Sequence, residues 1–397
     1  MTNLAELLTL ESLDRDPDPI LARLRDEAPV AFSASMNLWL VTRWDDVETM
    51  DLHPEIFSAT TEPSFLRRAL GVNMLTLDAP EAARLKNAMM PPFQRSGTSG
   101  SFAEEMLPAL CDALIDGFYQ DGHADLMSPY AAAVSAASLK TVLGLSDSTW
   151  QQVWKWCKGL CADISNFEND PEKKALGERA KRDLEVALDA AMEALRETTN
   201  DTAIAHMLSV DAEGKPLARE EIINNVRLMI SGGINEPRDG IGLAAWMLLK
   251  DPELREQVVS EPKLWRRLVD EVMRLHSPVG TITRQTTEDV ELAGTKIPKG
   301  ALVAGVLRSA NLDERRWTDP MKLDLRRGEG GHAAFALGQH RCLGEWLGRQ
   351  EVAIGTERLF SRLPNLRLDT DGGDAGDVEL HGFEFRGPKA LKVRWDV

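Results

Sequence analysis

The feature that most constrains this chain is a ten-residue stretch, residues 335–344, that holds a single cysteine between glycines. An amphipathic pattern follows at once, over residues 345–359, so the stretch predicts a glycine-rich turn that feeds a helix. Cys342 then lies at the junction, near the unpaired N–H groups and the positive end of the helix. Both effects favour the thiolate, which is the form of cysteine that binds a metal. A lone cysteine near a helix start can also be a small buried apolar residue.

The spacing inside this stretch favours the metal-binding alternative. The pattern Phe-x-x-Gly-x-His-x-Cys-x-Gly, from Phe335 to Gly344, resembles the haem-binding loop of the cytochrome P-450 superfamily. The resemblance implies that Cys342 is the only axial protein ligand of haem b and that Phe335 packs beside the ring. It also implies that Gly344 lets the backbone pass under the porphyrin. His340 and Arg341 would then donate to a haem propionate.

Length and composition are consistent with one large domain. The 397 residues are 43% hydrophobic and 27% charged, which is enough for a sizeable core and argues against disorder. No linker, repeat or low-complexity segment divides the chain, so we expect a single domain over residues 1–397. By the resemblance its fold is mainly α with small β-sheets. In that cytochrome P-450 fold the haem lies between a long oxygen-binding helix and the helix that follows the cysteine loop.

Local patterns predict where some of the elements lie. Apolar residues recur with the period of a helix or alternate with the period of a strand. The expected helices cover residues 20–27, 45–52 and 265–276, and the expected strands cover residues 30–32 and 38–41 and short parts of 279–303 and 378–395.

The charge of the chain and its first residues limit the partners that it can have. A formal net charge of −17 disfavours nucleic acid and anionic membranes. Residues 1–16 carry neither an apolar run nor a basic start, so we expect no signal peptide, no membrane anchor and a cytoplasmic protein. The four cysteines show no framework spacing, which fits a reducing cytosol. Cys157 and Cys161 are one helical turn apart, but no cluster of further metal ligands accompanies them.

A long helical pattern over residues 220–250 is interrupted in its middle by Ser-Gly-Gly-Ile-Asn-Glu-Pro at residues 231–237. Glycine inside a helix costs about 1 kcal/mol and proline about 3 kcal/mol. We therefore expect the helix to open or kink at Pro237, either for function or for packing alone. The interruption resembles the oxygen-binding helix of the superfamily, where small residues, here Gly232 and Gly233, leave room beside the iron.

The two residues before the proline depart from the usual superfamily pattern. The superfamily places an acid and then a threonine there, which supply protons to bound oxygen, whereas this chain has Asn235 and Glu236. The Glu-Pro pair resembles a minority of bacterial members, including the branch that removes methyl groups from aromatic ethers such as guaiacol and syringol. A carboxylate is a stronger base than a hydroxyl, so Glu236 could relay protons or take one from hydrogen peroxide. Alternatively, Glu236 turns away and pairs with a cation such as Arg238.

A second motif is the pair Glu271 and Arg274, three residues apart on the expected helix 265–276. Most such pairs are solvated surface contacts. The pair resembles the Glu-x-x-Arg of the superfamily, which braces the core on the haem side together with an arginine farther along the chain. Lys322 stands where we expect that arginine, which predicts a looser network because lysine offers a point charge rather than a fork.

Further cations are candidates for the haem propionates. Arg284 matches a superfamily position that pairs with a propionate. The superfamily often holds a propionate with a histidine and an arginine four residues apart, and this chain has Ala82 and Lys86 at those places. The resemblance therefore implies that Lys86 or Arg84 supplies this cation.

The expected substrate pocket has apolar walls. Its roof is the apolar segment 57–77, which shows no clear period, and short strands after the helix 265–276 and in the tail contribute further residues. Few ionisable groups occur among them, so we expect a small neutral aromatic or apolar substrate, with ordinary core packing as the alternative for each residue. The expected pocket residues are Phe65, Leu70, Val72, Leu75, Ile230, Val279, Ile282 and Phe385.

The resemblance implies a haem-thiolate monooxygenase that uses dioxygen and electrons from a ferredoxin or from a flavin or iron–sulfur reductase. The Glu-Pro pair adds the expectation of hydrogen peroxide as an oxidant, that is, peroxygenase activity. The reaction we expect is oxidative O-demethylation of a methoxyphenol-type ether, which yields a phenol and formaldehyde. Two alternatives stay open, a hydroxylase of a terpenoid or polyketide and a haem protein that senses or carries a ligand without turnover.

Overall fold

The computed structural model describes residues 4–166, 169–196, 200–209, 215–369 and 378–397. Two units of packed secondary structure contain these residues. The sheet unit holds the described residues of 1–62, 246–342 and 377–390. The helical unit holds those of 63–245, 343–376 and 391–397. Helix α14 (Asn235–Lys250) begins in the helical unit and ends in the sheet unit.

The sheet unit is built on five strands in the order β1-β2-β8-β5-β3. β2 and β8 run parallel, whereas the other neighbours run antiparallel. Val30 lies opposite Val41 in the β1–β2 hairpin, whose turn contains Asn37 at a φ of 50°. Asparagine tolerates this left-handed conformation better than most residues do. The strands are β1 (Val30–Ser33), β2 (Leu38–Val41), β3 (Phe57–Ser58), β5 (Thr281–Thr286) and β8 (Leu302–Val306).

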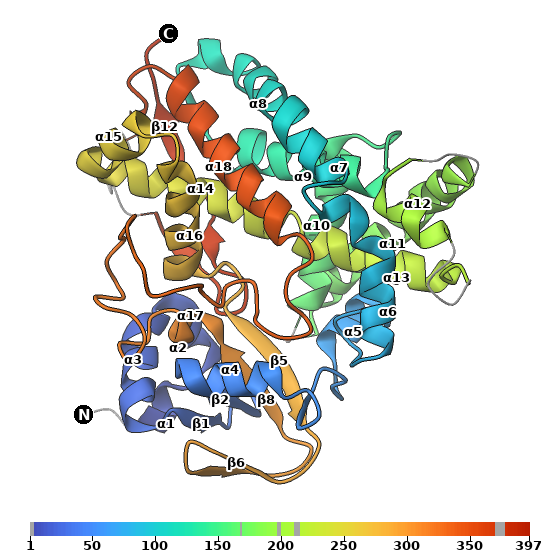
Figure 1. The fold of residues 1–397 in the computed structure, drawn as a ribbon, viewed down its shortest axis with the longest axis vertical. Coiled ribbons are helices and arrows are strands. Elements are labelled where there is room, and N and C mark those ends of the chain that lie inside the picture. The colour runs from blue at the N-terminus through green and yellow to red at the C-terminus, as the bar shows by residue number, and fades with distance from the viewer. Residues whose placement is uncertain (1–3, 167–168, 197–199, 210–214, 370–377) are drawn as a thin grey trace. The chain divides into compact units, whose positions relative to one another are not determined.

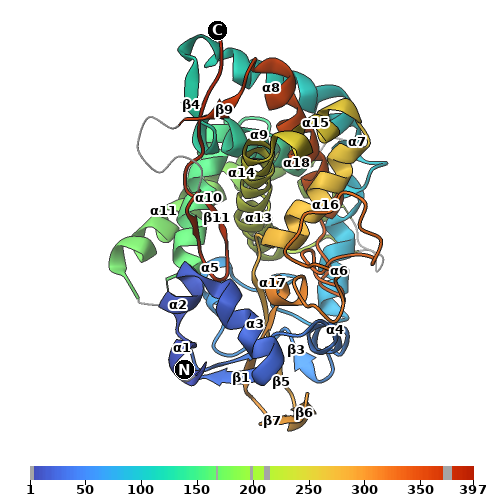
Figure 2. The ribbon, with the colours of Figure 1, turned by 90° about the vertical axis from the view of Figure 1, so that its left-hand side faces the viewer.

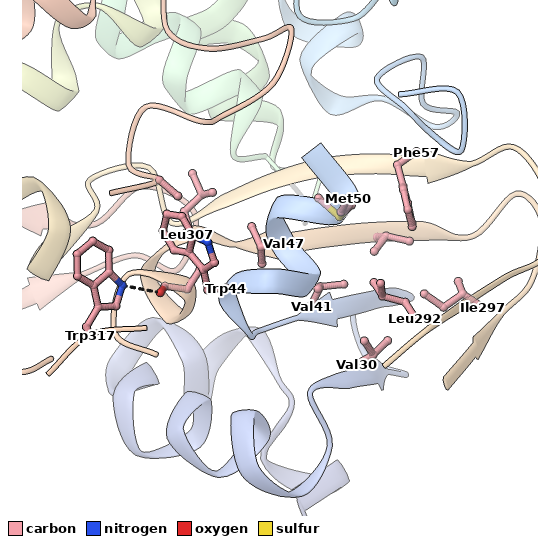
Figure 3. Packing of buried hydrophobic residues seen from close by; sticks show 13 residues of the cluster. Val30, Val41, Trp44, Val47, Met50, Phe57, Leu292, Ile297, Leu307 and Trp317 are labelled. Carbon is pink, nitrogen blue, oxygen red and sulfur yellow. Dashed lines mark hydrogen bonds between the residues drawn. The ribbon is translucent and has the colours of Figure 1, made fainter. Parts of the chain in front are cut away.

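Helix α4 (Trp44–Leu52) packs on this sheet and supplies much of its core (Figure 3). A Cβ added to Gly305 of β8 would lie 2.6 Å from Cε of Met50 and 3.3 Å from Cγ1 of Val47. Glycine at this position therefore lets the helix approach the sheet closely. Trp317 belongs to the same core, and its indole N–H donates to the carbonyl of Ala310 at 3.2 Å (Figure 3).

Shorter elements complete the sheet unit. β6 pairs with β7, and β10 pairs with β11, both in antiparallel fashion. Phe385 forms an isolated bridge with Val279, so the turn after β10 lies beside the segment that precedes β5. These elements are α1 (Leu4–Leu7), α2 (Leu10–Arg15), α3 (Pro17–Glu27), α15 (Pro252–Ser260), α16 (Leu264–His276), α17 (Leu307–Ala310), β6 (Val290–Leu292), β7 (Thr295–Ile297), β10 (Leu380–His381) and β11 (Gly387–Pro388).

The helical unit consists mainly of helices (Figure 1). α10 and α11 pack closely, since a Cβ added to Gly159 would lie 2.6 Å from Cβ of Ala180. Its helices are α5 (Phe65–Leu70), α6 (Glu81–Met89), α7 (Thr98–Ser101), α8 (Leu107–Asp116), α9 (Ala132–Leu143), α10 (Trp150–Ile164), α11 (Pro171–Leu195), α12 (Ala203–Leu208), α13 (Arg219–Gly232) and α18 (Glu345–Arg362), with short helical turns at Pro91–Phe93, Phe102–Met106, Tyr119–Asp121 and Met127–Ala131. A small sheet, β4 (His123–Asp125), β12 (Lys392–Arg394) and β9 (Arg367–Leu368), includes the C-terminal strand (Figure 2).

Most of the locally predicted elements are confirmed. The early helix, hairpin and helix are α3, β1–β2 and α4, and the helix expected over residues 265–276 is α16. The segment 57–77 is not wholly irregular, because the Ser64 hydroxyl accepts from the Arg67 amide and caps α5. Along the described chain, no helix combines the length and the apolar character that crossing a membrane requires.

Candidate functional site

The cysteine loop is folded by its own backbone. The amide of Cys342 donates to the carbonyl of Phe335, and the amide of Arg341 donates to the carbonyl of Gly338, both at 2.9 Å. These bonds turn the chain tightly just before α18. Cys342 itself is exposed, so the interpretation of this residue as a small buried apolar side chain is wrong.

One residue of the loop has a backbone conformation that residues other than glycine rarely adopt. Ala336 has a φ of 59° and is almost fully buried. The left-handed region costs a residue with a Cβ about 1–2 kcal/mol. Strain of this kind concentrates where a loop must present a functional group in a fixed position.

A buried carboxylate from α4 holds the same loop. The Oδ2 atom of Asp51 accepts from the amide of Leu337 at 2.7 Å and from the amide of Gly338 at 2.9 Å. The loop backbone lies so close that a Cβ on Gly338 would stand 2.1 Å from the carbonyl oxygen of Asp51. Glycine is therefore required at this position by close approach, and Asp51 is a residue that sequence reasoning missed.

Arg284 shares this carboxylate. Its guanidinium donates to Oδ1 of Asp51 at 2.9 Å and to the carbonyl of Thr283 at 2.9 Å. Both charged side chains are buried within the sheet unit. A buried carboxylate that accepts from two amides and an arginine is well satisfied, which makes it a rigid anchor. The expected role of Arg284 at a haem propionate stays a prediction.

The Glu271–Arg274 pair is a buried network rather than a surface contact. Two nitrogens of Arg274 donate to the two carboxylate oxygens of Glu271 at 2.7 and 2.9 Å. The third member is Arg327, whose Nε lies 3.1 Å from each of these oxygens. The expectation that Lys322 fills this place is wrong, because the Lys322 side chain is exposed and only its carbonyl accepts from both arginines. The presence of an arginine, Arg327, five residues after Lys322 could have pointed to the correct residue, because a guanidinium matches the two oxygens of a carboxylate better than an ammonium does.

The predicted opening of the long helix is confirmed. α13 ends at Gly232 and α14 begins at Asn235, so the chain leaves the helical path at residues 233–234. Pro237 falls in the first turn of α14, where its missing N–H leaves no bond unmade. A Cβ on Gly233 would stand 2.6 Å from the carbonyl of Met229, whereas one on Gly232 would meet no atom within 4 Å.

Glu236 carries a buried acid at this break. The residue as a whole is half-buried, but its Oε2 atom is closed to solvent and has no hydrogen-bond partner among the described residues. Burial raises the pKa of this carboxyl from 4.5 to about 8, and the charge of Asp239 adds to the rise, although a hydrogen bond from its own backbone amide and the charge of Arg238 oppose it. Arg238 donates to Asp239 at 2.9 Å and stacks on Trp154. The alternative in which Glu236 pairs with Arg238 is therefore wrong.

Asn235 points to a different neighbour. Its side-chain amide donates to Sγ of Cys161 at 3.1 Å, and the thiol of Cys161 lies 3.4 Å from the carbonyl of Ser231. The thiols of Cys157 and Cys161 are 3.9 Å apart. Along the described chain there is no group of three or more His, Cys, Asp or Glu side chains that could hold a metal ion. Asn235 thus ties the break to α10, and its catalytic role stays a prediction.

The remaining predicted cofactor residues lie in several settings. Arg84 of α6 pairs with Glu221 of α13, and Lys86 is half-buried. Phe335 and His340 are half-buried, and the ring of Phe335 lies 5.7 Å from that of His332.

The predicted pocket residues divide by exposure. Leu70 and Ile230 are fully buried, whereas Phe65 and Val72 are exposed. The half-buried ones are Leu75, Val279, Ile282 and Phe385. The structure brings Val279 and Phe385 together through their bridge, and Val279 and Ile282 pack against the core of the sheet unit.

The mostly helical fold with small sheets and the exposed cysteine in its glycine-flanked loop agree with the class of haem-thiolate proteins. A comparison with protein families matches residues 145–371, more than half of the chain, to the family described as Cytochrome P450. The chain therefore belongs to the cytochrome P450 family, whose members are monooxygenases that bind haem through a cysteine thiolate. Bacterial members use oxygen and redox partners such as ferredoxins and reductases.

Individual relatives agree with this assignment. The chain is 29% identical over 391 residues to cytochrome P450 monooxygenase PikC of Streptomyces venezuelae, covering 96% of this chain and 91% of that protein. It is 29% identical over 364 residues to the vitamin D(3) 25-hydroxylase of Pseudonocardia autotrophica, covering 89% and 88%. The ligand-free structure of cytochrome P450 TbtJ1 matches with a TM-score of 0.86 at 27% identity, covering 97% and 99%. Neither relative is named for an aromatic ether.

The residues of this chain fit a haem with a single thiolate ligand. Cys342 is an exposed residue, and the described residues offer no alternative cluster of metal ligands. A Cβ added to Gly344, like one on Gly232, would meet no atom within 4 Å. The buried Oε2 of Glu236 has no partner in the described chain. An exposed cysteine in a tightly hydrogen-bonded loop of the sheet unit is what a prosthetic group with one thiolate ligand requires.

Proposed function

We propose that this monooxygenase holds the haem iron through Cys342 and acts on a small apolar or aromatic molecule. Bound haem supplies the oxygen-activating chemistry, and a thiolate ligand favours O–O cleavage. The state of the other cysteines supports Cys342. Cys111 and Cys157 are buried, and Cys161 accepts from Asn235.

The observation that carries the proposal is the buried carboxyl group of Glu236 with its raised pKa. Because its pKa is raised to about 8, the carboxyl group holds a proton at neutral pH and can give it to an oxygen acceptor within reach. The ionised fraction can accept a proton, for example from hydrogen peroxide. A general acid with a pKa near the working pH serves both directions of transfer, which the usual threonine hydroxyl cannot do as well.

For the reaction, we infer oxidative O-demethylation of a methoxyphenol-type ether. Hydroxylation of the methoxy carbon gives a hemiacetal, which breaks its carbon–oxygen bond to release a phenol and formaldehyde. With peroxide the balance is one ether and one peroxide to one phenol, one formaldehyde and one water. With dioxygen, two electrons from a ferredoxin or a flavin or iron–sulfur reductase and two protons give the same products. The apolar character of Val279, Ile282 and Phe385 supports a neutral substrate.

A second candidate function is hydroxylation of another apolar molecule, such as a terpenoid or a polyketide. The name of one relative, vitamin D(3) 25-hydroxylase, favours it, because that protein hydroxylates a larger apolar compound. The third alternative, a haem protein without turnover, is set aside because the family consists of monooxygenases.

Product analysis with guaiacol, syringol and an apolar polycyclic compound tests the proposal. Each is incubated with the purified protein and either hydrogen peroxide or a ferredoxin–reductase system. From each ether we expect formaldehyde and the demethylated phenolic product in equal amounts. We also expect the peroxide-driven rate to fall in both Glu236→Gln and Glu236→Thr. Hydroxylation of the polycyclic compound without formaldehyde from either ether supports the second candidate instead. Peroxide-driven rates that are negligible in wild type, or unchanged in both variants, refute the role of Glu236.

A further inference from the structure

The buried carboxylate of Asp51 joins three parts of the sheet unit that are far apart in sequence. It lies near the end of α4, it accepts from two amides of the cysteine loop, and it pairs with Arg284 of β5. Its side chain is only 1% exposed. A charge this deeply buried persists only where the surrounding donors satisfy it, so its position is fixed by all three partners at once.

The two amides that Asp51 holds lie on the cysteine side of the strained residue of the loop. Ala336 has its positive φ immediately before Leu337 and Gly338, whose N–H groups point at Oδ2 of Asp51. Gly338 in turn accepts from the amide of Arg341, next to Cys342. A continuous set of hydrogen bonds therefore runs from the carboxylate to the residue beside the sulfur.

From this geometry we propose that Asp51 is a positioning residue for the haem-thiolate centre. It fixes the loop that presents Cys342, and it fixes the direction of the Arg284 guanidinium. The inference rests on the proposed role of Cys342 as the iron ligand. Asp51 touches neither substrate nor iron in this account and acts only through the loop and the arginine.

The isosteric change Asp51→Asn tests this role, because it removes the charge and puts an N–H₂ group where a second acceptor is needed. Asp313, which follows α17, provides a matched control, because its carboxylate caps the first residue of the same helix, α4. Its side chain is also 1% exposed, and it accepts from the amide of Trp44 at 2.9 Å and from the amide of Arg315 at 3.0 Å. Asp313→Asn therefore removes a comparable buried carboxylate at the other end of α4 without touching the cysteine loop.

Two readouts separate positioning from general stability. The first is hydrogen exchange at the amides of Leu337 and Gly338, which we expect to be about tenfold faster or more in Asp51→Asn and unchanged in Asp313→Asn. The second is the reduced carbon-monoxide complex, in which we expect Asp51→Asn to lose part of the red-shifted Soret band of thiolate ligation to an unshifted form. Asp313→Asn should keep the full red-shifted band.

Unchanged exchange and an unchanged band in Asp51→Asn overturn the proposal, and so do equal changes in Asp51→Asn and Asp313→Asn. If Asp51→Asn does not fold, the wild-type protein decides. Its Leu337 and Gly338 amides must exchange far more slowly than that of the exposed Gly331, and equal rates overturn the proposal. A wild type without the red-shifted band refutes the assignment of Cys342 and with it the role of Asp51 toward the iron, while the exchange data still report whether Asp51 holds the loop.

Discussion

Replacing Glu236 by glutamine tests whether its carboxyl group is neutral at physiological pH. Burial raises the pKa of this group from 4.5 to about 8, and glutamine is close in shape to the protonated acid but cannot ionise. Between these two pH values the folded wild type keeps a proton that the unfolded chain releases. The stability of the wild type therefore falls as the pH rises through this window, and that of Glu236→Gln lacks this component.

The size of the effect follows from the two pKa values. In the unfolded chain the pKa of this carboxyl is 4.5, so pH 7 lies about 2.5 units above it and the group is ionised. In the folded protein the group is still mostly protonated at pH 7. One unit corresponds to about 1.4 kcal/mol, so the variant should gain about 3 kcal/mol over wild type between about pH 4.5 and 7. The gain should approach about 5 kcal/mol above pH 8, where both states are ionised.

Denaturant unfolding of the ferric protein at about pH 5, 6, 7 and 8 measures this difference. Glu253→Gln is the matched control, because Glu253 is also the second residue of its helix, α15, but is exposed. We expect the control to change stability by less than about 0.5 kcal/mol at every pH. A difference between wild type and Glu236→Gln that stays constant from about pH 5 to 8 would show that the pKa of Glu236 is not raised in the folded protein.

Three further substitutions, two of them with a paired control substitution, test the packing around the site. Ala336→Gly should raise the free energy of unfolding by about 1 kcal/mol, because glycine adopts the positive φ without a Cβ penalty; no gain in thermal or denaturant unfolding contradicts the strain argument. Arg327→Lys should lower the free energy of unfolding by about 2–3 kcal/mol, because it loses the two-sided contact of the guanidinium with Glu271. Lys322→Arg at the exposed position should leave it unchanged. A larger effect at Lys322 than at Arg327 would restore Lys322 as the third member of the network. Gly233→Ala should cost about 1–3 kcal/mol because its Cβ would meet the carbonyl of Met229, whereas Gly232→Ala should cost less in the same unfolding assay; equal costs contradict the close approach at Gly233.

Local sequence patterns predicted much of the secondary structure. The predicted starts and ends of α3, α4 and α16 lie within a few residues of the observed ones, because their apolar period is uninterrupted. The opening between α13 and α14 was also predictable, since two glycines and a proline are locally unfavourable in a helix. The helix α5 was not predicted, because its start depends on one side-chain cap from Ser64 in a segment without a period.

The side chains that hold the predicted site residues in place could not be identified from the sequence. Asp51 lies 286 residues before Leu337, and nothing in its local pattern distinguishes it from an exposed helical aspartate. Arg327 was missed because the segment before the cysteine loop has no period that fixes which basic side chain turns inward. Cys342 and Glu236 were predicted as site residues from their neighbours in sequence, whereas the contacts around them form only in the folded chain.

The reduced carbon-monoxide spectrum of the wild type, of Cys342→Ala and of Cys161→Ala shows whether Cys342 is the iron ligand. Cys161 is the appropriate control, because it is the other cysteine that is not fully buried. We expect the red-shifted Soret band of thiolate ligation in wild type and in Cys161→Ala, and its complete loss in Cys342→Ala. A red-shifted band that persists in Cys342→Ala would contradict the assignment of Cys342 as the iron ligand.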